Sequence, residues 1–408
     1  MRIGFLFNHD QIHQIGHSLP IALALAEMEP KIDVVVATTN ERLRAEVTRL
    51  ISKRGESNIS LVDLRPSSFL SRIAVALLDG LVPAAKLFVY RDNLPFFRSL
   101  DALVVAEKTS TILKTRYGLS NLRLIHTRHG AGDRAIGFDK ASARFDQVLV
   151  SGRKIRERLI KDAGVEPDRL SMVGYPKFDL LPEAPRRLPF QANGRPTVLY
   201  NPHVSPHLSS WYLNGRAVLD FFVEHPEYNL IFAPHVMLFE RPFVFTIDKM
   251  RLDLPGSIDD KYWNAANIHI DLGSGACTDM SYTLAADLYL GDVSSQVYEF
   301  LLNPRPCVFL NSHNVRFRND PNYTHWQAGQ VISRPTELGA ALREAWASHD
   351  TYRSVQCRLF DQSFDINDTP SSIRAAGAIM EFLRRTSSAN GELIADPRSL
   401  PRRHQVAA

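Results

Sequence analysis

The chain has 408 residues, of which 45% are apolar and 23% are charged, and its formal net charge is +4. This length and composition indicate two or three ordinary globular domains and exclude a small disulfide-stapled or largely disordered protein. The charge is too mild for a nucleic-acid binder, although the arginines leave an anionic substrate or membrane face open beside a mixed, solvated surface.

Cysteine usage and hydropathy indicate where the protein works. Cys277, Cys307 and Cys357 are scattered and lack metal-ligand spacing, which favours a reducing compartment and gives no sign of zinc. No stretch has the roughly 18 apolar residues of a membrane span, and the N-terminus lacks a signal-peptide cleavage site. We therefore expect a cytoplasmic protein. Peripheral attachment to the inner face of the cell membrane through residues 71–97 stays open beside core packing of the same segment.

Strand-like and helix-like segments alternate through the first half of the chain. The expected strands are 3–8, 32–38, 59–64, 102–106, 122–126 and 147–151, and the expected helices include 19–27 and 42–53. The strands are continuous apolar runs rather than alternating ones. This pattern predicts a parallel sheet covered by helices on both faces.

A proline-rich break separates this half from a second α/β series. Residues 181–196 contain four prolines and a glycine with little periodicity, which is typical of a linker. Strands are then expected at 197–200, 229–233, 268–271, 287–290 and 307–310, and helices at 217–224, 337–347 and 371–384. The predicted organisation is an N-terminal acceptor-side Rossmann-like domain (1–184), a linker (185–196), a nucleotide-donor domain (197–370), a closing helix (371–386) and a polar tail (387–408). Two doubly wound domains would face a cleft at the carboxyl ends of their strands.

The most informative segment is 285–310, which reads as a strand, a tight Gly-Asp-Val-Ser-Ser turn, a helix, a proline-bounded loop and another strand. Asp292 or Ser294 is placed to cap the helix. The helix N-terminus offers free N–H groups and a positive dipole end, and Ser294 and Ser295 add hydroxyl donors. An isolated Ser-Ser pair is more often an ordinary cap, but this one follows a strand. Glu299, one turn further on, is expected to reach ribose hydroxyls.

Three histidines also follow predicted strands. His129 comes after the strand at 122–126, His203 after 197–200, and His235 after 229–233. A single loop histidine is usually a solvated surface group, but three at strand ends indicate a cleft. Imidazole acts there as a general base or as a cation beside phosphate.

These motifs resemble the CDP-glycerol glycerophosphotransferases of teichoic-acid and capsule assembly, which adopt the GT-B fold. Residues 291–302 resemble the Asp-Tyr-Ser-Ser motif of that family, and His129-Gly130 resembles its His-Gly-Thr motif, whose histidine is taken as the catalytic base. Pro234-His235 resembles a second essential histidine that contacts donor phosphate, and Ser371-Ser-Ile-Arg374 a late Ser-x-Arg helix start.

The chain departs from the family pattern mainly on the acceptor side. The family motif His-Gly-Thr-x-x-Lys is here His-Gly-Ala-Gly-Asp-Arg134, and Ala-Pro-Thr-Trp is here Asn-Pro-His203-Val. The donor side is better preserved. The departures therefore fall on the acceptor side and on the transferred group rather than on the nucleotide site.

The resemblance implies transfer of a glycerol-phosphate-like phosphopolyol from a CDP-linked donor to a hydroxyl of a glycan or lipid-linked acceptor in cell-envelope polysaccharide synthesis. It implies neither a metal nor another cofactor. The expected site residues are His129 and His235 for catalysis, Ser294, Ser295, Arg134 and His203 for donor phosphate, Glu299 and Asp292 for ribose or base, and Gly16, His17 and Gly130 on the acceptor side.

Three alternatives stay open at this point. One is a GT-B glycosyltransferase that uses a nucleotide-sugar donor, such as a UDP-sugar, and another is a UDP-sugar 2-epimerase-like enzyme. The third is a non-catalytic nucleotide-binding or membrane-associated assembly factor. His9, His13 and His17 are spaced by four and would align on a helix as metal ligands, but a strand ending near Asn8 favours a loop there.

Overall fold

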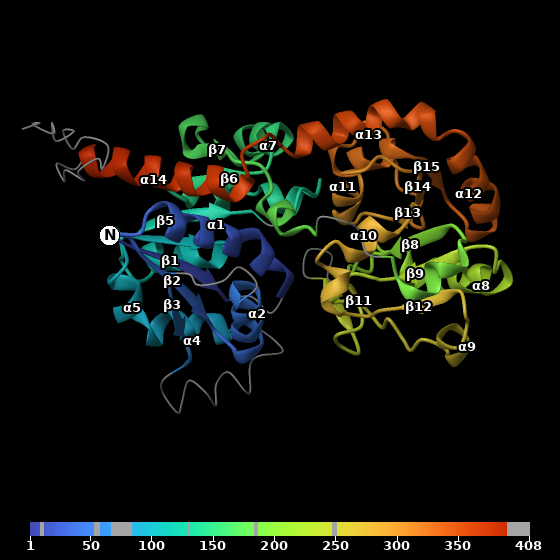
Figure 1. The fold of residues 1–408 in the computed structure, drawn as a ribbon, viewed down its shortest axis with the longest axis horizontal. Coiled ribbons are helices and arrows are strands. Elements are labelled where there is room, and N and C mark those ends of the chain that lie inside the picture. The colour runs from blue at the N-terminus through green and yellow to red at the C-terminus, as the bar shows by residue number, and fades with distance from the viewer. Residues whose placement is uncertain are drawn as a thin grey trace, which may run out of the picture.

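The computed structural model describes residues 1–8, 12–52, 58–66, 84–128, 130–182, 187–246 and 251–389. Two parallel sheets lie side by side, each flanked by helices (Figure 1). The first sheet has the order β3-β2-β1-β4-β5-β6-β7. Its strands are β1 (Arg2–Phe7), β2 (Asp33–Thr38), β3 (Ile59–Asp63), β4 (Ala102–Val105), β5 (Arg123–Thr127), β6 (Gln147–Val150) and β7 (Leu170–Met172).

The second sheet has the order β12-β9-β8-β13-β14-β15 and is also parallel throughout. Its strands are β8 (Thr197–Asn201), β9 (Asn229–Phe232), β12 (Ile268–Ile270), β13 (Leu288–Gly291), β14 (Cys307–Leu310) and β15 (Gln330–Ile332). A separate antiparallel pair, β10 (Val244–Thr246) and β11 (Arg251–Asp253), stands beside it.

Helices cover both faces of each sheet because alternate strand residues point to opposite sides. In β1, Ile3, Phe5 and Phe7 belong to one apolar cluster and Leu6 to the cluster on the other face, and all four are at most 2% exposed. The helices are α1 (Ile15–Met28), α2 (Glu41–Ser52), α4 (Ala84–Asp92), α5 (Leu94–Arg98), α6 (Ile112–Thr115), α7 (Arg153–Ala163), α8 (Arg216–Glu224), α9 (Asp260–Trp263), α10 (Ser281–Ala285), α11 (Gln296–Phe300), α12 (Leu338–Ala347), α13 (His349–Ser363) and α14 (Ser371–Ala389).

The chain crosses between the two sheets twice. Residues 173–196 lead from β7 to β8 and include the single-turn helix η6 (Pro176–Leu180). After α13, which lies over the second sheet, the chain returns as α14, which runs along the first sheet (Figure 1). Ile379 and Leu383 of α14 pack in the same apolar cluster as Leu25 of α1.

The strands expected from the sequence all coincide with strands of the structure, and the prediction of two parallel-sheet, Rossmann-like units facing one another is confirmed. The sequence reasoning missed β7, β10, β11 and β15, which have only three residues each, and the polar helix α13. The structure also corrects two boundaries. α1 begins at Ile15, so Gly16 and His17 lie in a helix rather than a loop, and α14 continues to Ala389, beyond the expected start of the tail at 387. Among the described helices, none is both long and apolar enough for a membrane span.

Candidate active site

A cavity of about 360 Å³ lies where the carboxyl ends of the two sheets face each other. Segments that follow β5 and β7 form the wall on the first-sheet side. Segments that follow β8, β9 and β13 form the opposite wall. The cavity is lined, among others, by His17, Gly130, Arg134, His203, His235, Ser294, Ser295 and Glu299. The structure therefore brings together eight of the eleven site residues predicted from the sequence.

The remaining three are Gly16, Asp292 and His129. Gly16 packs against Leu180 and Lys177 near η6 and does not line the cavity. His129 lies outside the described residues, as does His9, and the side chain of His13 is likewise not described. The role of His129 as the acceptor base stays a prediction.

Asp292 organises the floor of the site instead of facing it. Its carboxylate is 1% exposed and accepts hydrogen bonds from the backbone amides of His203 (2.9 Å), Ser210 (2.6 Å) and Val293 (2.6 Å). Burial raises the pKa of Asp292, although these hydrogen bonds oppose the rise. The carboxylate thus joins the loop after β8 to the turn after β13, which corrects the expectation that it caps α11. Its contact with the nucleotide stays a prediction.

The Ser294–Ser295 turn follows β13 as expected, but the helix behind it is short. α11 has five residues and no side-chain cap, so its macrodipole contributes less to anion binding than the sequence suggested. The turn is instead enclosed from across the cavity. A Cβ on Gly132 would lie 3.1 Å from the Ser295 Cβ, and Gly130 has a φ of +80° beside the Ser295 hydroxyl. These glycines let the loop after β5 approach the turn closely.

His203 and His235 form a pair of neutral donors on the second-sheet wall. Their ring centroids are 5.9 Å apart. The backbone amides of Ser205 and Met237 donate to the Nδ1 atoms of His203 (3.0 Å) and His235 (3.3 Å), so each ring carries its proton on Nε2. Burial lowers the pKa of His235 to about 4, and burial with the His235 and Arg134 charges lowers that of His203. In the absence of an anion both rings serve as neutral hydrogen-bond donors rather than as cations, one of the two roles that the sequence suggested for them.

Glu299 has partners that the sequence did not predict. Lys177 Nζ lies 2.7 and 2.8 Å from its two carboxylate oxygens, and Tyr175 donates its hydroxyl at 2.7 Å. Both charged side chains are 8% exposed. Since Lys177 follows the first sheet and Glu299 is in α11, this ion pair joins the two halves of the molecule. Glu299 still lines the cavity, so ribose contact stays a prediction.

Asp133 is the centre of a second link between the halves. Its carboxylate accepts hydrogen bonds from Lys154 Nζ (2.9 Å), the Tyr298 hydroxyl (2.6 Å) and both Nδ1 (2.9 Å) and the backbone amide of His325 (3.1 Å). Burial alone would raise the pKa of Asp133. The positive charge of Lys154 and the hydrogen bonds from His325 and Tyr298 outweigh burial and hold the pKa well below its usual range.

The ring of His325 connects this link to the floor of the site. Its Nε2 lies 3.0 Å from the carbonyl oxygen of Asp292, which also accepts a 2.6 Å hydrogen bond from Trp326 Nε1. Asp133 therefore fixes the loop that carries Arg134 and, through His325, the turn that carries Ser294.

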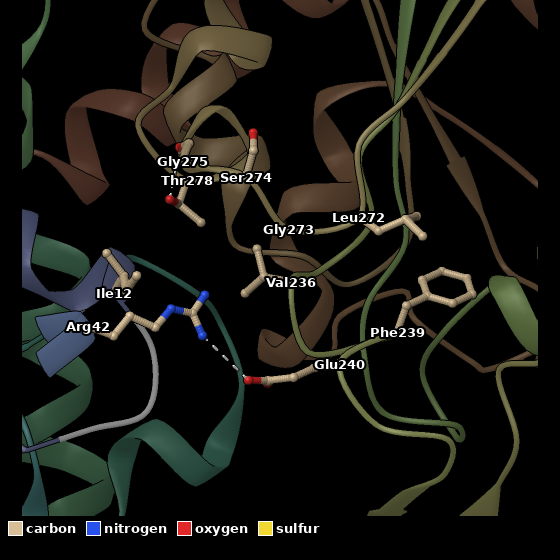
Figure 2. Close-up of a pocket in the computed structure, with 10 residues that line it drawn as sticks. All are labelled: Ile12, Arg42, Val236, Phe239, Glu240, Leu272, Gly273, Ser274, Gly275 and Thr278. Atoms are coloured by element: carbon tan, nitrogen blue, oxygen red, sulfur yellow. Dashed lines mark hydrogen bonds and ion pairs between the residues drawn. The ribbon is translucent and has the colours of Figure 1, made fainter. Parts of the chain in front are cut away.

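A smaller pocket of about 180 Å³ continues the cavity, with Val236 and Thr278 lining both (Figure 2). Arg42 of α2 reaches across it toward Glu240, with 3.9 Å between Nη1 and Oε1. Leu272 and Phe239 contribute apolar surface and residues 273–275 contribute backbone. The pocket thus offers a mixed apolar and polar extension of the main cavity.

Two further cavity residues were given no role from the sequence. Arg128 lies within the histidine-bearing segment 126–134, and Lys177 lies outside every motif considered, yet both line the cavity. Arg128 directly precedes His129 after a strand, and this position could have predicted its place in the cavity. The position of Lys177 could not, because the three-residue strand before it was not recognised. Among the described residues, no group of three His, Cys, Asp or Glu side chains is arranged to hold a metal ion.

Known structures share this architecture. A Listeria monocytogenes protein assigned as a UDP-N-acetylglucosamine 2-epimerase matches with a TM-score of 0.57 and 13% identity over 97% of this chain and 98% of its own. The wall teichoic acid polymerase TagF, in a structure with CDPG, matches at 0.59 and 14% over 96% and 90%. The glycotransferase of kitacinnamycin matches at 0.55 and 14% over 93% and 98%. No protein-family model and no curated protein matches the sequence. The structural matches establish the GT-B fold that the sequence predicted.

Proposed function

We propose that this protein is a transferase that uses a nucleoside-diphosphate-linked donor and acts in the synthesis of a cell-envelope polymer. The favoured reaction moves a glycerol-phosphate-like group from a CDP-linked donor to a hydroxyl of a glycan or lipid-linked acceptor. The observation that carries the proposal is the set of anion-binding groups that converge on one cavity. The Nε2–H groups of His203 and His235, the Ser294–Ser295 turn and the Arg134 guanidinium all line it.

The charge of the cavity also supports an anionic donor. Its lining includes three cationic side chains, Arg128, Arg134 and Lys177, and one carboxylate, Glu299. Because Lys177 is neutralised by Glu299, two positive charges remain to face a ligand. Anionic groups of the bound substrates would compensate them.

The chemistry of the favoured reaction follows from this arrangement. The acceptor oxygen attacks the phosphorus that bears the glycerol, a new P–O bond forms, and the bond to the bridging oxygen breaks to release CMP. His203, His235 and Arg134 stabilise the charge that develops on the departing phosphate. The acceptor proton passes to His129, a role that rests on the family resemblance. The two interdomain links around Asp133 and Glu299 would hold the reacting groups in position.

The smaller pocket in Figure 2 is suited to the nucleoside. It adjoins the phosphate-binding groups, and the side chains of Phe239 and Leu272 provide apolar contact while residues 273–275 offer backbone groups. Proteins bind small ligands in such partly apolar recesses with a few placed polar groups.

The similarity to sugar-nucleotide enzymes supports a second candidate. The protein assigned as a UDP-N-acetylglucosamine 2-epimerase matches the fold about as well as TagF does. A UDP-sugar glycosyltransferase or 2-epimerase would use the same phosphate-binding wall. Incubation with UDP-N-acetylglucosamine alone, followed by chromatography, distinguishes an epimerase because that reaction needs no acceptor.

Calorimetric titration of the full chain with CDP, CMP, UDP, GDP and CDP-glycerol tests the proposal directly. We expect CDP or CDP-glycerol to bind most tightly and a Ser294→Ala/Ser295→Ala variant to bind at least about ten-fold more weakly, since two charge-assisted hydrogen bonds are lost. Ser52→Ala, which alters an exposed serine of α2 outside both pockets, is the control that should bind like wild type. A preference for UDP or GDP would move the function to sugar transfer, and no binding of any nucleotide would refute the proposal.

A further inference from the structure

The cavity has a second cationic group whose position differs from that of Arg134. The charge of Arg134 acts on His203 and Tyr323, which belong to the second-sheet side. Arg128 instead lies against η3 (Ala135–Phe138), where its Nη1 donates to the Gly137 carbonyl at 2.5 Å and its guanidinium stacks 4.7 Å from the centre of the Phe138 ring. The two arginines therefore mark two different parts of the cavity wall.

Arg128 is partly buried and forms no ion pair with a described carboxylate. No carboxylate in the described ranges lies within ion-pair distance of it, and its Nε is buried without a hydrogen-bond partner. Partial burial of a cation that has no ion-pair partner carries a desolvation cost. Burial, together with the nearby Arg158 charge, lowers the pKa of Arg128 to about 10, although the charge of Asp139 opposes this shift.

No neighbouring carboxylate in the described ranges is close enough to form an ion pair with Arg128. Lys154 and Arg158 are both cations, and each has its own carboxylate, Asp133 and Asp162 respectively. Asp139 is engaged by Lys108 at 2.7 Å. The positive charge of Arg128 is thus left over at the wall of a cavity, where a ligand can reach it.

We infer that Arg128 anchors a second anion subsite, separate from the donor-phosphate wall, which binds an oxyanion carried by the acceptor. A guanidinium has several N–H donors in one plane, and only Nη1 is used by the protein, so a phosphate or carboxylate group suits the remainder. Gly137 lets the guanidinium lie close against η3, because a Cβ there would lie 3.0 Å from Nη2. The inference rests on the proposed function only for the identity of the ligand as the acceptor.

The test uses inorganic phosphate and acetate as probes in calorimetric titrations of the full chain, with and without saturating CDP. Wild type should bind one of the two probes in both conditions. Arg128→Gln should weaken that binding at least about ten-fold, as expected for the loss of a charge-assisted contact. Its affinity for CDP should stay unchanged. Arg153→Gln, which removes an exposed arginine of α7 outside the cavity, is the control that should bind like wild type.

Melting temperatures of wild type and Arg128→Gln provide a second test that does not depend on the titrations. Because Arg128→Gln removes a partly buried charge without an ion-pair partner, its melting temperature without anions should equal or exceed that of wild type. With the donor site saturated by CDP, phosphate should stabilise only wild type. Equal probe binding by wild type and Arg128→Gln, competition between probe and CDP, or no probe binding would each overturn the inference. Failure of CDP to bind wild type would refute the proposed function instead and leave the probe result valid.

Discussion

Replacing Asp133 with Asn should weaken the contact between the two halves of the molecule and lower the free energy of unfolding. The substitution keeps the shape of the side chain and one acceptor oxygen but removes the negative charge on which Lys154, Tyr298 and His325 converge. Lys154 is 11% exposed at its side chain and would remain as an unpaired cation. Burial already lowers the pKa of Lys154, and this effect would no longer be opposed by a carboxylate.

The expected magnitude follows from the burial of the ion pair. Removing one partner of a buried ion pair costs about 3–5 kcal/mol, and the lost hydrogen bonds are part of that figure. In acid, wild type should lose the stability that the Asp133 carboxylate contributes, because the carboxylate becomes protonated. The depressed pKa of Asp133 means that, below about pH 4, protons bind the unfolded chain before the folded one, so the free energy of unfolding falls as the pH drops.

Urea denaturation followed by tryptophan fluorescence and circular dichroism measures the effect. All four tryptophans lie beyond residue 197, so fluorescence reports the second domain while circular dichroism reports both. The matched control is Asp139→Asn, whose ion pair with Lys108 is 46% exposed at the carboxylate and should cost less than about 1 kcal/mol. A double Asp133→Asn/Lys154→Met variant should recover much of the loss. If Asp133→Asn were no more destabilising than Asp139→Asn, the interdomain link would not carry the energy assigned to it.

Three other perturbations can be checked in the same denaturation assays. Gly174→Ala should lower the free energy of unfolding by more than about 2 kcal/mol, because φ is +82° and a Cβ would lie 2.8 Å from a backbone carbonyl oxygen. Its control, Gly118→Ala, has φ +69° and open space around the Cβ and should lower it by about 1 kcal/mol. Lys177→Met should cost about 3–5 kcal/mol by leaving Glu299 buried without its cation, and Lys177→Met/Glu299→Gln should regain stability; equal losses would contradict this account. Since burial lowers the pKa of His235 to about 4, the free energy of unfolding should fall by up to about 3 kcal/mol between pH 6.5 and pH 4, and His235→Asn should flatten that slope.

The sequence predicted the fold because local patterns determine it. Continuous apolar runs such as 102–106 and 307–310 are long enough to be recognised as buried strands, and their alternation with helices requires parallel sheets. His203, His235 and Ser294 each come just after a predicted strand of the second sheet. Because the carboxyl ends of parallel strands meet at one edge, this position alone predicted that the three residues line one cavity.

The interdomain contacts could not be predicted in the same way. Asp133 meets Tyr298 across 165 positions and Lys177 meets Glu299 across 122, and nothing local to either residue signals the encounter. Asp292 was assigned to the helix cap because its sequence position fits one. The loop after β8, which is close in space and distant in sequence, supplies stronger donors and takes the carboxylate away from α11.

The return of α14 to the first sheet has a consequence for biosynthesis. Ile379 and Leu383 complete the apolar layer over Leu25 of α1, so the second domain is in effect an insertion between two parts of the first. On the ribosome, the N-terminal sheet emerges first, yet its outer layer stays uncovered until α14 has been translated. A nascent chain that stops before residue 371 would keep that apolar surface open to chaperones and aggregation, so the N-terminal domain depends on α14 for its completion.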